Sequence, residues 1–155
     1  MKKLKNKITD LGLELPAPPQ AVANYVPYVI DRHQLFISGQ LPFLNGQVMH
    51  VGKLGDTYTV EQGQEAAKCC ALNLLSLLDH AIDGDLDRLE QLIKLGGFVN
   101  STPDFTDHPA VINGASDLMA EVLGDKGRHA RFAMGAGSLP KGVAVEIDAV
   151  FSLKI

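Results

Sequence analysis

The stretch HARFAMGAGSLPKGVAVEIDAVF, residues 129–151, decides the fold of this chain. It consists of two mostly apolar segments of strand-like composition, separated by SLPKG, in which proline and glycine are typical of a turn. The pattern predicts a β-hairpin that closes the chain. The earlier segments must then be arranged around this pair of strands.

Two charged residues interrupt these strands, Arg131 in the first and Glu146 in the second. A buried arginine normally has an anionic or acceptor partner, and its planar guanidinium matches a carboxylate with two hydrogen bonds. Arg131 is therefore either the anchor for a small acid or half of a structural ion pair with Glu146, Asp148 or an acid of a neighbouring chain. With the turn near Pro140, Arg131 lies opposite Val150, about 13 Å along the strands from Glu146 at roughly 3.3 Å per residue. We therefore expect the two side chains to hold opposite ends of a small ligand if they share a site.

The alternation of the second strand leaves another interpretation open. Val145 and Ile147 lie on one face of that strand, and Ala144, Glu146 and Asp148 lie on the other. A solvent-exposed face would account for both acids without any function.

The remaining segments carry alternating strand and helix signals. Helices are assigned from apolar residues at helical spacing, and strands from short apolar runs between turn residues. In the first part of the chain we expect a short amphipathic helix in residues 1–12, an extended proline-rich connector over 14–27, two strands around a turn at 31–33, and a hairpin turn at Asn45-Gly46. In the second part we expect a long helix over 59–81, a strand over 89–101 with a bulge at Gly96-Gly97, and a second long helix over 108–123.

This order of elements predicts an α+β fold with a mixed sheet and two long helices on one face. Many positions on the other face are apolar, notably in LFISG at 35–39 and VAVEIDAVF at 143–151. We therefore expect that face to be buried against sister subunits. The domain organisation expected is an N-terminal helix and lead-in over residues 1–15, followed by a single domain over 16–155.

Composition excludes several classes of function. The 155 residues are 46% hydrophobic and 21% charged, with a formal net charge of −4, so general attraction to nucleic acid or to an anionic membrane is not expected. The apolar runs are too short and too interrupted to span a bilayer. The only cysteines, Cys69 and Cys70, are adjacent on a predicted helix and point about 100° apart, which disfavours a disulfide and favours a reduced, cytoplasmic compartment.

Metal binding is not predicted either. None of the five histidines has the spacing of a helical metal motif, and the adjacent cysteines do not form a C-x-x-C pair. The glycine-rich segments GDKGR and GAGSLPKG follow neither the phosphate-loop nor the dinucleotide pattern, and they predict turns.

Four stretches resemble one known family. NYVPYV, LFISGQLP, VINGASDL and the segment over 129–151, in that order, are similar to the RidA (YjgF-type) family of reactive-intermediate imine deaminases, whose members are often labelled endoribonuclease L-PSP or translation inhibitor. The resemblance extends from about Pro16 to Phe151. The N-terminal helix and the stretch GFVNS…FTD…VINGASDL are similar to the family's longer bacterial branch.

The resemblance implies a chorismate-mutase-like α+β fold assembled as a homotrimer, with three sites in clefts between subunits. It implies that Arg131 grips the carboxylate of the substrate and that Glu146 orders the attacking water. The other residues that it places around the pocket are Tyr25, Ser38, Gly39 and Asn113.

Two positions beside Arg131 depart from the family pattern. Ala133 stands where deaminase members usually have a cysteine, and Phe132 replaces a residue that is usually small. We expect the phenyl ring to narrow or redirect the pocket, whereas the carboxylate grip of Arg131 is retained.

The function implied is hydrolysis of small 2-imino acids to 2-oxo acids and ammonia, without a metal or an organic cofactor. The expected partners are a small 2-imino or 2-oxo carboxylic acid and further copies of this chain. One alternative is a non-catalytic binder or sensor of small carboxylic acids that uses the same cleft. Another is an endoribonuclease, which the acidic composition and the lack of a basic, aromatic stripe disfavour.

Overall fold

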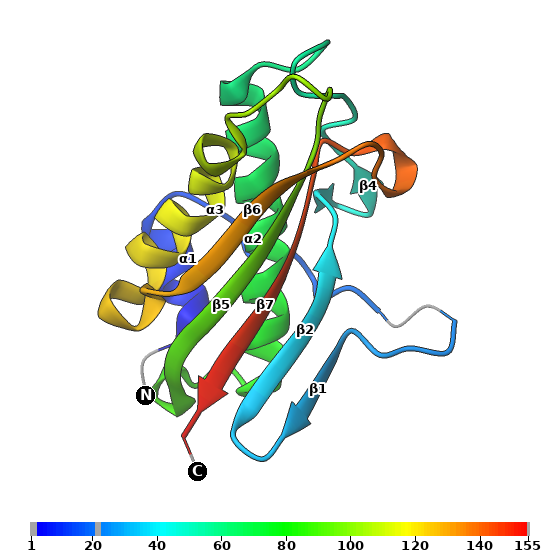
Figure 1. Cartoon of the computed structure of the whole chain (residues 1–155). Coiled ribbons are helices and arrows are strands. Elements are labelled where there is room, and N and C mark those ends of the chain that lie inside the picture. The colour runs from blue at the N-terminus through cyan, green and yellow to red at the C-terminus, as the bar shows by residue number, and fades with distance from the viewer. Residues whose placement is uncertain (1–2, 21–22, 155) are drawn as a thin grey trace.

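A five-stranded mixed sheet with helices on one face forms the body of the protein (Figure 1). The computed structural model describes residues 3–20 and 23–154. The helices are α1 (Leu4–Asp10), α2 (Val60–Ala81) and α3 (His108–Leu123). The strands are β1 (Tyr28–Asp31), β2 (Gln34–Gln40), β3 (Phe43–Leu44), β4 (Gln47–Val48), β5 (Leu89–Asn100), β6 (Ala130–Ala136) and β7 (Val145–Leu153).

The predicted α+β class, the two long helices on one face and the hairpin around Asn45-Gly46 are confirmed. The main sheet has the order β1-β2-β7-β5-β6, in which β5 and β6 are parallel and the other pairs are antiparallel. Residues 1–2 of the expected first helix and 21–22 of the expected connector lie outside the described residues. None of the helices in the described parts of the chain combines the length and apolar character that a membrane crossing requires.

The predicted C-terminal hairpin is wrong. The central strand β5 lies between β6 and β7, pairing in parallel with the first and antiparallel with the second. Arg131 is therefore opposite Leu95 on β5 and not opposite Val150, while Glu146 is opposite Phe98. Residues 137–144 cross the end of β5, since β5 can satisfy the backbone hydrogen bonds of both neighbours and they need not pair with each other.

The bulge expected at Gly96-Gly97 is also wrong. The register between β5 and β7 shifts between Leu89 and Gln91 and between Leu92 and Lys94, and it is continuous through both glycines. Gly96 is required because a Cβ there would overlap the Asp148 carboxylate, and one on Gly97 would overlap the side chain of Ile112 on α3. These glycines permit close packing on both faces of the sheet.

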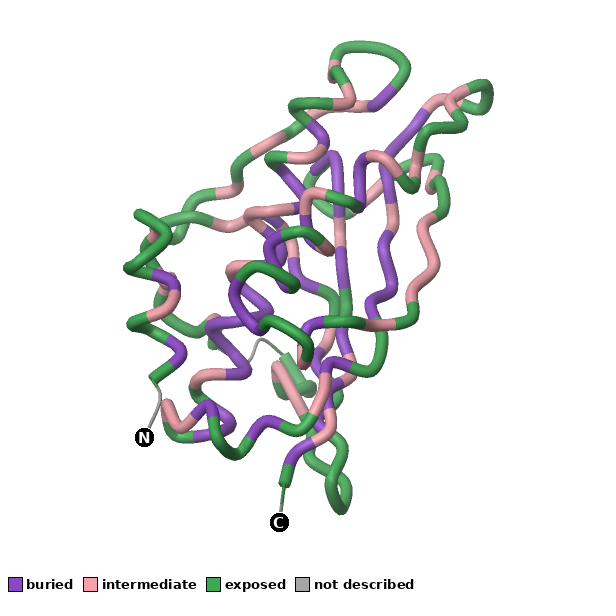
Figure 2. Tube along the Cα trace, turned by 90° about the vertical axis from the view of Figure 1, so that its left-hand side faces the viewer, coloured by how far each residue is buried: buried purple, intermediate pink, exposed green. Residues whose placement is uncertain are grey.

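The core lies between the sheet and the two long helices. Helix α2 begins with a capping box, in which the Thr59 side chain accepts from the Gln62 backbone and the Gln62 side chain accepts from the Thr59 backbone. Buried positions line the facing surfaces while the connecting loops are mostly exposed (Figure 2). The fully buried side chains include Leu74 and Leu78 of α2, Val111 and Ile112 of α3, Leu95 of β5, and Ile147 and Phe151 of β7.

Gly114 in the middle of α3 sets the distance between the two helices. A Cβ at this position would overlap the backbone carbonyl of Gln64 on α2. The Gln64 side chain donates from Nε2 to the carbonyl oxygen of Ala110, at 2.9 Å. Close packing of the helices therefore explains a glycine that costs about 1 kcal/mol relative to alanine in an open helix.

Candidate functional site

Arg131 lies on the face of β6 that is turned toward α3. Its Nη1 donates to the Ser116 hydroxyl at 3.1 Å, and its Nη2 donates to the carbonyl oxygen of Pro109 at 3.2 Å. Both acceptors are neutral. Within residues 3–20 and 23–154 the one ion pair is between Arg88 and Asp83, so no carboxylate neutralises this guanidinium. The protein therefore holds Arg131 in place with its charge uncompensated and with N–H groups left to donate.

Asn113 lies on the same face of α3 as the two groups that hold the guanidinium. It is four residues after Pro109 and three before Ser116, a spacing that brings helical residues onto one side. Asn113 is exposed. The helix thus presents an amide beside the cation, where both can donate hydrogen bonds to an anion.

A hydrogen-bonded chain fixes the Ser116 hydroxyl. His129 Nδ1 lies 2.6 Å from the carbonyl oxygen of Gly127, and its Nε2 lies 2.9 Å from Ser116 Oγ. Since a carbonyl only accepts, Nδ1 carries a proton, and in the neutral ring Nε2 accepts the serine proton. The lone pairs of Ser116 are then directed at Arg131. Sequence reasoning missed Ser116, although it follows Asn113 by three residues within VINGASDL.

Glu146 belongs to the opposite face of the sheet. It is half-buried on β7, and a Cβ on Gly39 of β2 would overlap its carboxylate, so the glycine makes room for the acid. Burial, and then the negative charge of Asp148, raise the pKa of Glu146 above its usual value. A carboxylate of this kind is a stronger base than an exposed one.

Ser38 anchors the segment that carries Tyr25. The Ser38 hydroxyl and its backbone N–H both donate to the carbonyl oxygen of Pro27, at 2.8 and 3.0 Å. Tyr25 lies two residues before that proline and is 58% exposed. Gly39 adjoins Glu146, and Ser38 precedes it at the register shift between Ile37 and Gln40 in the pairing of β2 with β7.

The structure does not bring the two sets of residues into one cleft within a single chain. Arg131 and Asn113 belong to the helix side of β6, at one edge of the sheet. Glu146 and Gly39 belong to the open face, on β7 and β2. Arg131 and Glu146 therefore do not adjoin within one chain, because β5 separates their strands and their side chains point to opposite faces.

The two residues that depart from the family pattern are also separated by the sheet. Ala133 faces α3 and packs against the core, two residues along the same side of β6 as Arg131. Phe132 faces the open side. Its ring packs edge-on with that of Phe98, with 5.3 Å between the two centroids, and the ammonium of Lys94 lies 5.3 Å from the centroid of the Phe132 ring. Phe132 therefore does not narrow the surroundings of the guanidinium in its own chain.

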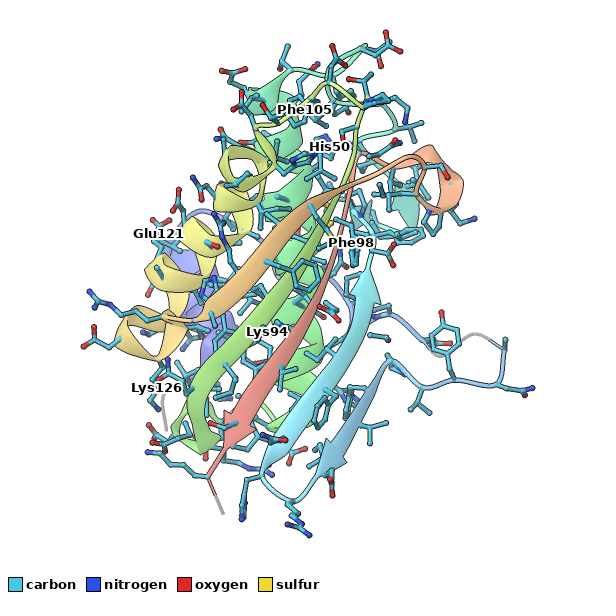
Figure 3. All side chains as sticks on the ribbon, in the orientation of Figure 1. His50, Lys94, Phe98, Phe105, Glu121 and Lys126 are labelled. Carbon is cyan, nitrogen blue, oxygen red and sulfur yellow. The ribbon has the colours of Figure 1, made fainter. Side chains whose placement is uncertain are left out.

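The open face of the sheet carries apolar side chains on either side of the acids of β7. Phe98, Phe132 and Met134 cluster on β5 and β6, and Phe36 lies on β2; Met134 is 47% and Phe36 42% exposed. Lys94 and Phe98 mark this face in Figure 3. Such a large exposed apolar surface is typical of a contact with another protein chain.

No group of three or more His, Cys, Asp or Glu side chains is placed to hold a metal ion in the part of the chain that the structure describes. Cys69 and Cys70 are both free. Burial raises the pKa of Cys69 to about 11 and that of Cys70 well above its usual value. Neither thiol is therefore activated as a nucleophile.

The fold and the uncompensated arginine define a class of α+β proteins suited to small anionic ligands. The family described as "YjgF/chorismate_mutase-like, putative endoribonuclease" matches residues 5–147, and the chain belongs to it. The protein TCP17 of Trypanosoma cruzi is 49% identical over 144 residues, which cover 92% of this chain and 89% of TCP17.

Solved structures agree with this assignment. The protein Atu1372 of Agrobacterium tumefaciens, of unknown function, is 44% identical with a TM-score of 0.91, over 97% of this chain and 93% of that one. TdcF of Escherichia coli, solved with bound serine, is 22% identical with a TM-score of 0.63, over 89% of this chain and 94% of TdcF. The latter likeness establishes the fold alone.

Proposed function

We propose that the protein is an enamine/imine deaminase that hydrolyses small 2-imino acids to 2-oxo acids and ammonia. The observation that carries this proposal is the guanidinium of Arg131, held by two neutral acceptors with no acid among the described residues to neutralise it. A small carboxylate is the ligand that such a group matches. The serine bound to TdcF carries a carboxylate of this kind.

The complete site forms between copies of the chain in a homotrimer. The apolar open face around Phe36, Phe98 and Met134 supports assembly, because it is left without a cover in one chain. The separation of Arg131 from Glu146 supports a shared site, in which the arginine of one subunit adjoins the glutamate of the next. Tyr25, Ser38 and Gly39 accompany the glutamate, and Asn113 accompanies the arginine.

The reaction follows from these positions. Arg131 fixes the substrate carboxylate and thereby the imine carbon, and Glu146 removes a proton from a water as its oxygen attacks that carbon. Glu146 returns this proton to the imine nitrogen, which gives a carbinolamine. It then takes the hydroxyl proton of the carbinolamine and passes it to the amino nitrogen, so that the carbon–nitrogen bond breaks as the carbonyl forms, and ammonia and a 2-oxo acid are released. The raised pKa of Glu146 makes its carboxylate a stronger base toward the attacking water. No step requires a thiol at position 133.

The first experiment measures the loss of 2-aminoacrylate generated in situ. The wild type should accelerate hydrolysis of the derived imine and release pyruvate. Arg131→Ala should abolish the acceleration, and Arg131→Lys should retain only part of it because an ammonium cannot form the paired hydrogen bonds. No acceleration by the wild type on this or a bulkier imino acid would refute the proposal.

A complementation experiment tests the shared site. Arg131→Ala and Glu146→Gln subunits, each inactive alone, are unfolded together and refolded as a mixture. If each site takes one residue from each of two subunits, random assembly restores about a quarter of the sites. A mixture as inactive as its parents would refute a site between subunits.

A second candidate function rests on Ala133, which removes the thiol usual at that position in the deaminases that the chain resembles. It is a non-catalytic binder of small carboxylic acids in the same cleft. That function predicts that 2-oxobutanoate protects the protein saturably against unfolding, without turnover of any imine.

A free cysteine pair further supports a cytoplasmic location for either function.

A further inference from the structure

A cavity separate from these residues opens where β5 and β6 end and α3 begins. Its volume is about 460 Å³. Lys53, Ser101, Phe105 and His108 border it, together with the backbone of residues 135–137. We call it the Lys53 cavity. Phe105 marks its end of the molecule in Figure 3.

The ammonium of Lys53 is held rigidly at this cavity. Its Nζ donates to Asn100 Oδ1 and to the carbonyl oxygen of Gly137, each at 2.6 Å. Asn100 is buried, and its Nδ2 donates to the carbonyl oxygens of Gly52 and Val143, so its orientation is determined. Both acceptors of the lysine are neutral, and across the described ranges no carboxylate lies within ion-pair distance of it. One of the three ammonium protons remains to donate to a ligand.

A second polar group lines the same cavity. The hydroxyl of Ser101, a buried residue, lies 3.1 Å from His108 Nε2. The ring of His108 packs at 90° against Phe105, with 5.2 Å between centroids. Gly135 exposes this pair, because a Cβ there would lie 2.6 Å from His108 Nε2 and 2.8 Å from Ser101 Oγ. The glycine thus lets two groups that can form hydrogen bonds pack directly against the backbone of β6 at the border of the cavity.

We propose that the Lys53 cavity binds a small carboxylate with a flat apolar body. The carboxylate accepts from the free N–H of Lys53 and from the Ser101–His108 pair, and the apolar body packs on Phe105. A fixed, uncompensated cation beside an aromatic ring matches both halves of such a molecule. The cavity is distinct from the proposed deaminase site, since neither Arg131, Asn113 nor Ser116 lines it.

Benzoate is the probe, and benzamide is its neutral control with the same ring. Isothermal titration of the full chain should show saturable binding of benzoate and at least tenfold weaker binding of benzamide. Lys53→Met should weaken benzoate at least tenfold, since it removes the charge and preserves the length of the side chain. Lys141→Met, at an exposed lysine of the turn after β6, should leave binding unchanged. Arg131→Ala should leave unchanged the component of benzoate binding that Lys53→Met removes, whatever weaker binding the arginine itself contributes.

Nuclear magnetic resonance on the wild type tests the location without relying on any variant. Benzoate should shift the amide signals of Ser101, Gly135 and Gly137, and benzamide should not. Absence of binding, no loss of binding in Lys53→Met, or loss of all benzoate binding in Arg131→Ala would each overturn the proposal, and the last would place benzoate at the proposed deaminase site alone. If the wild type does not accelerate imine hydrolysis, the proposed deaminase function fails. The predicted binding of benzoate in the Lys53 cavity still stands, because the titration measures binding alone.

Discussion

Replacing Gly114 by alanine should destabilise the protein, although the same change in an open helix stabilises it. Alanine is favoured over glycine by about 1 kcal/mol in a helix interior. Here the new Cβ would overlap the carbonyl oxygen of Gln64 and lie 2.8 Å from its carbonyl carbon and 2.9 Å from its Cα. These atoms are backbone of α2, so relief requires the two helices to separate.

The magnitude follows from the difference between the two effects. Overpacking a close contact costs typically about 1–3 kcal/mol, and a contact with backbone belongs at the upper end of that range. After subtracting the gain in helix propensity, we expect the free energy of unfolding to fall by about 1–2 kcal/mol. The displacement of α3 would also move Asn113 and Ser116 away from Arg131, so imine hydrolysis should fall with stability.

Urea unfolding measures this effect. At one fixed protein concentration, Gly114→Ala should lower the midpoint with an unchanged slope. Gly137→Ala is the matched control, because a Cβ at position 137 meets nothing within 4 Å, and its midpoint should stay at the wild-type value or rise. A midpoint for Gly114→Ala at or above the wild-type value would show that the helices are not in close contact there.

Four further predictions concern the site and the thiols. Ser116→Ala should raise KM about tenfold with little change in kcat, because it frees the guanidinium of Arg131 without removing it; an unchanged KM would contradict a positioning role. Glu146→Gln should lower kcat by about 10²–10⁴-fold at similar KM. Because burial raises the folded pKa of Glu146 above its ordinary value of 4.5, the folded state binds more protons than the unfolded state just above that pH. Glu146 therefore lowers the free energy of unfolding as the pH rises from 4.5 toward its raised folded pKa. The stability of Glu146→Gln relative to wild type should then increase from about pH 4 to pH 7, which urea unfolding at each pH will measure. Cys69 and Cys70 should react slowly with iodoacetamide at neutral pH until urea unfolds the chain, and rapid labelling of the folded protein would contradict the raised pKa of both thiols and the burial of Cys70.

Periodicity located most of the helices and strands because local patterns of apolar residues reflect which side of an element is buried. The long helices over 59–81 and 108–123 were predicted nearly to the residue, and the family was identified from four short motifs. Alternation along the last strand correctly separated Val145 and Ile147 from Glu146 and Asp148. These features depend on residues close together in the chain.

Strand order was decided only by the tertiary structure. The turn residues in SLPKG showed that the chain reverses between β6 and β7, but they carry no information on whether β5 comes between the two strands. Because β5 lies between them, Arg131 is opposite Leu95 of β5 and not opposite Val150 of β7, as a hairpin would require. Glu146 lies on the opposite face of the sheet. The hydrogen-bonding capacity of both edges of β5 determines this arrangement, and it depends on the whole sheet.

The surroundings of each functional side chain likewise could not be predicted from the sequence. The sequence by itself determined which elements form, which family they belong to, and that Arg131 and Glu146 are unusual in apolar strands. The hydroxyl of Ser116 that holds Arg131, and the cavity that brings Lys53 to Ser101, arise from contacts between residues far apart in the chain. Such contacts depend on how helices and strands pack against one another, and only the folded chain decides them.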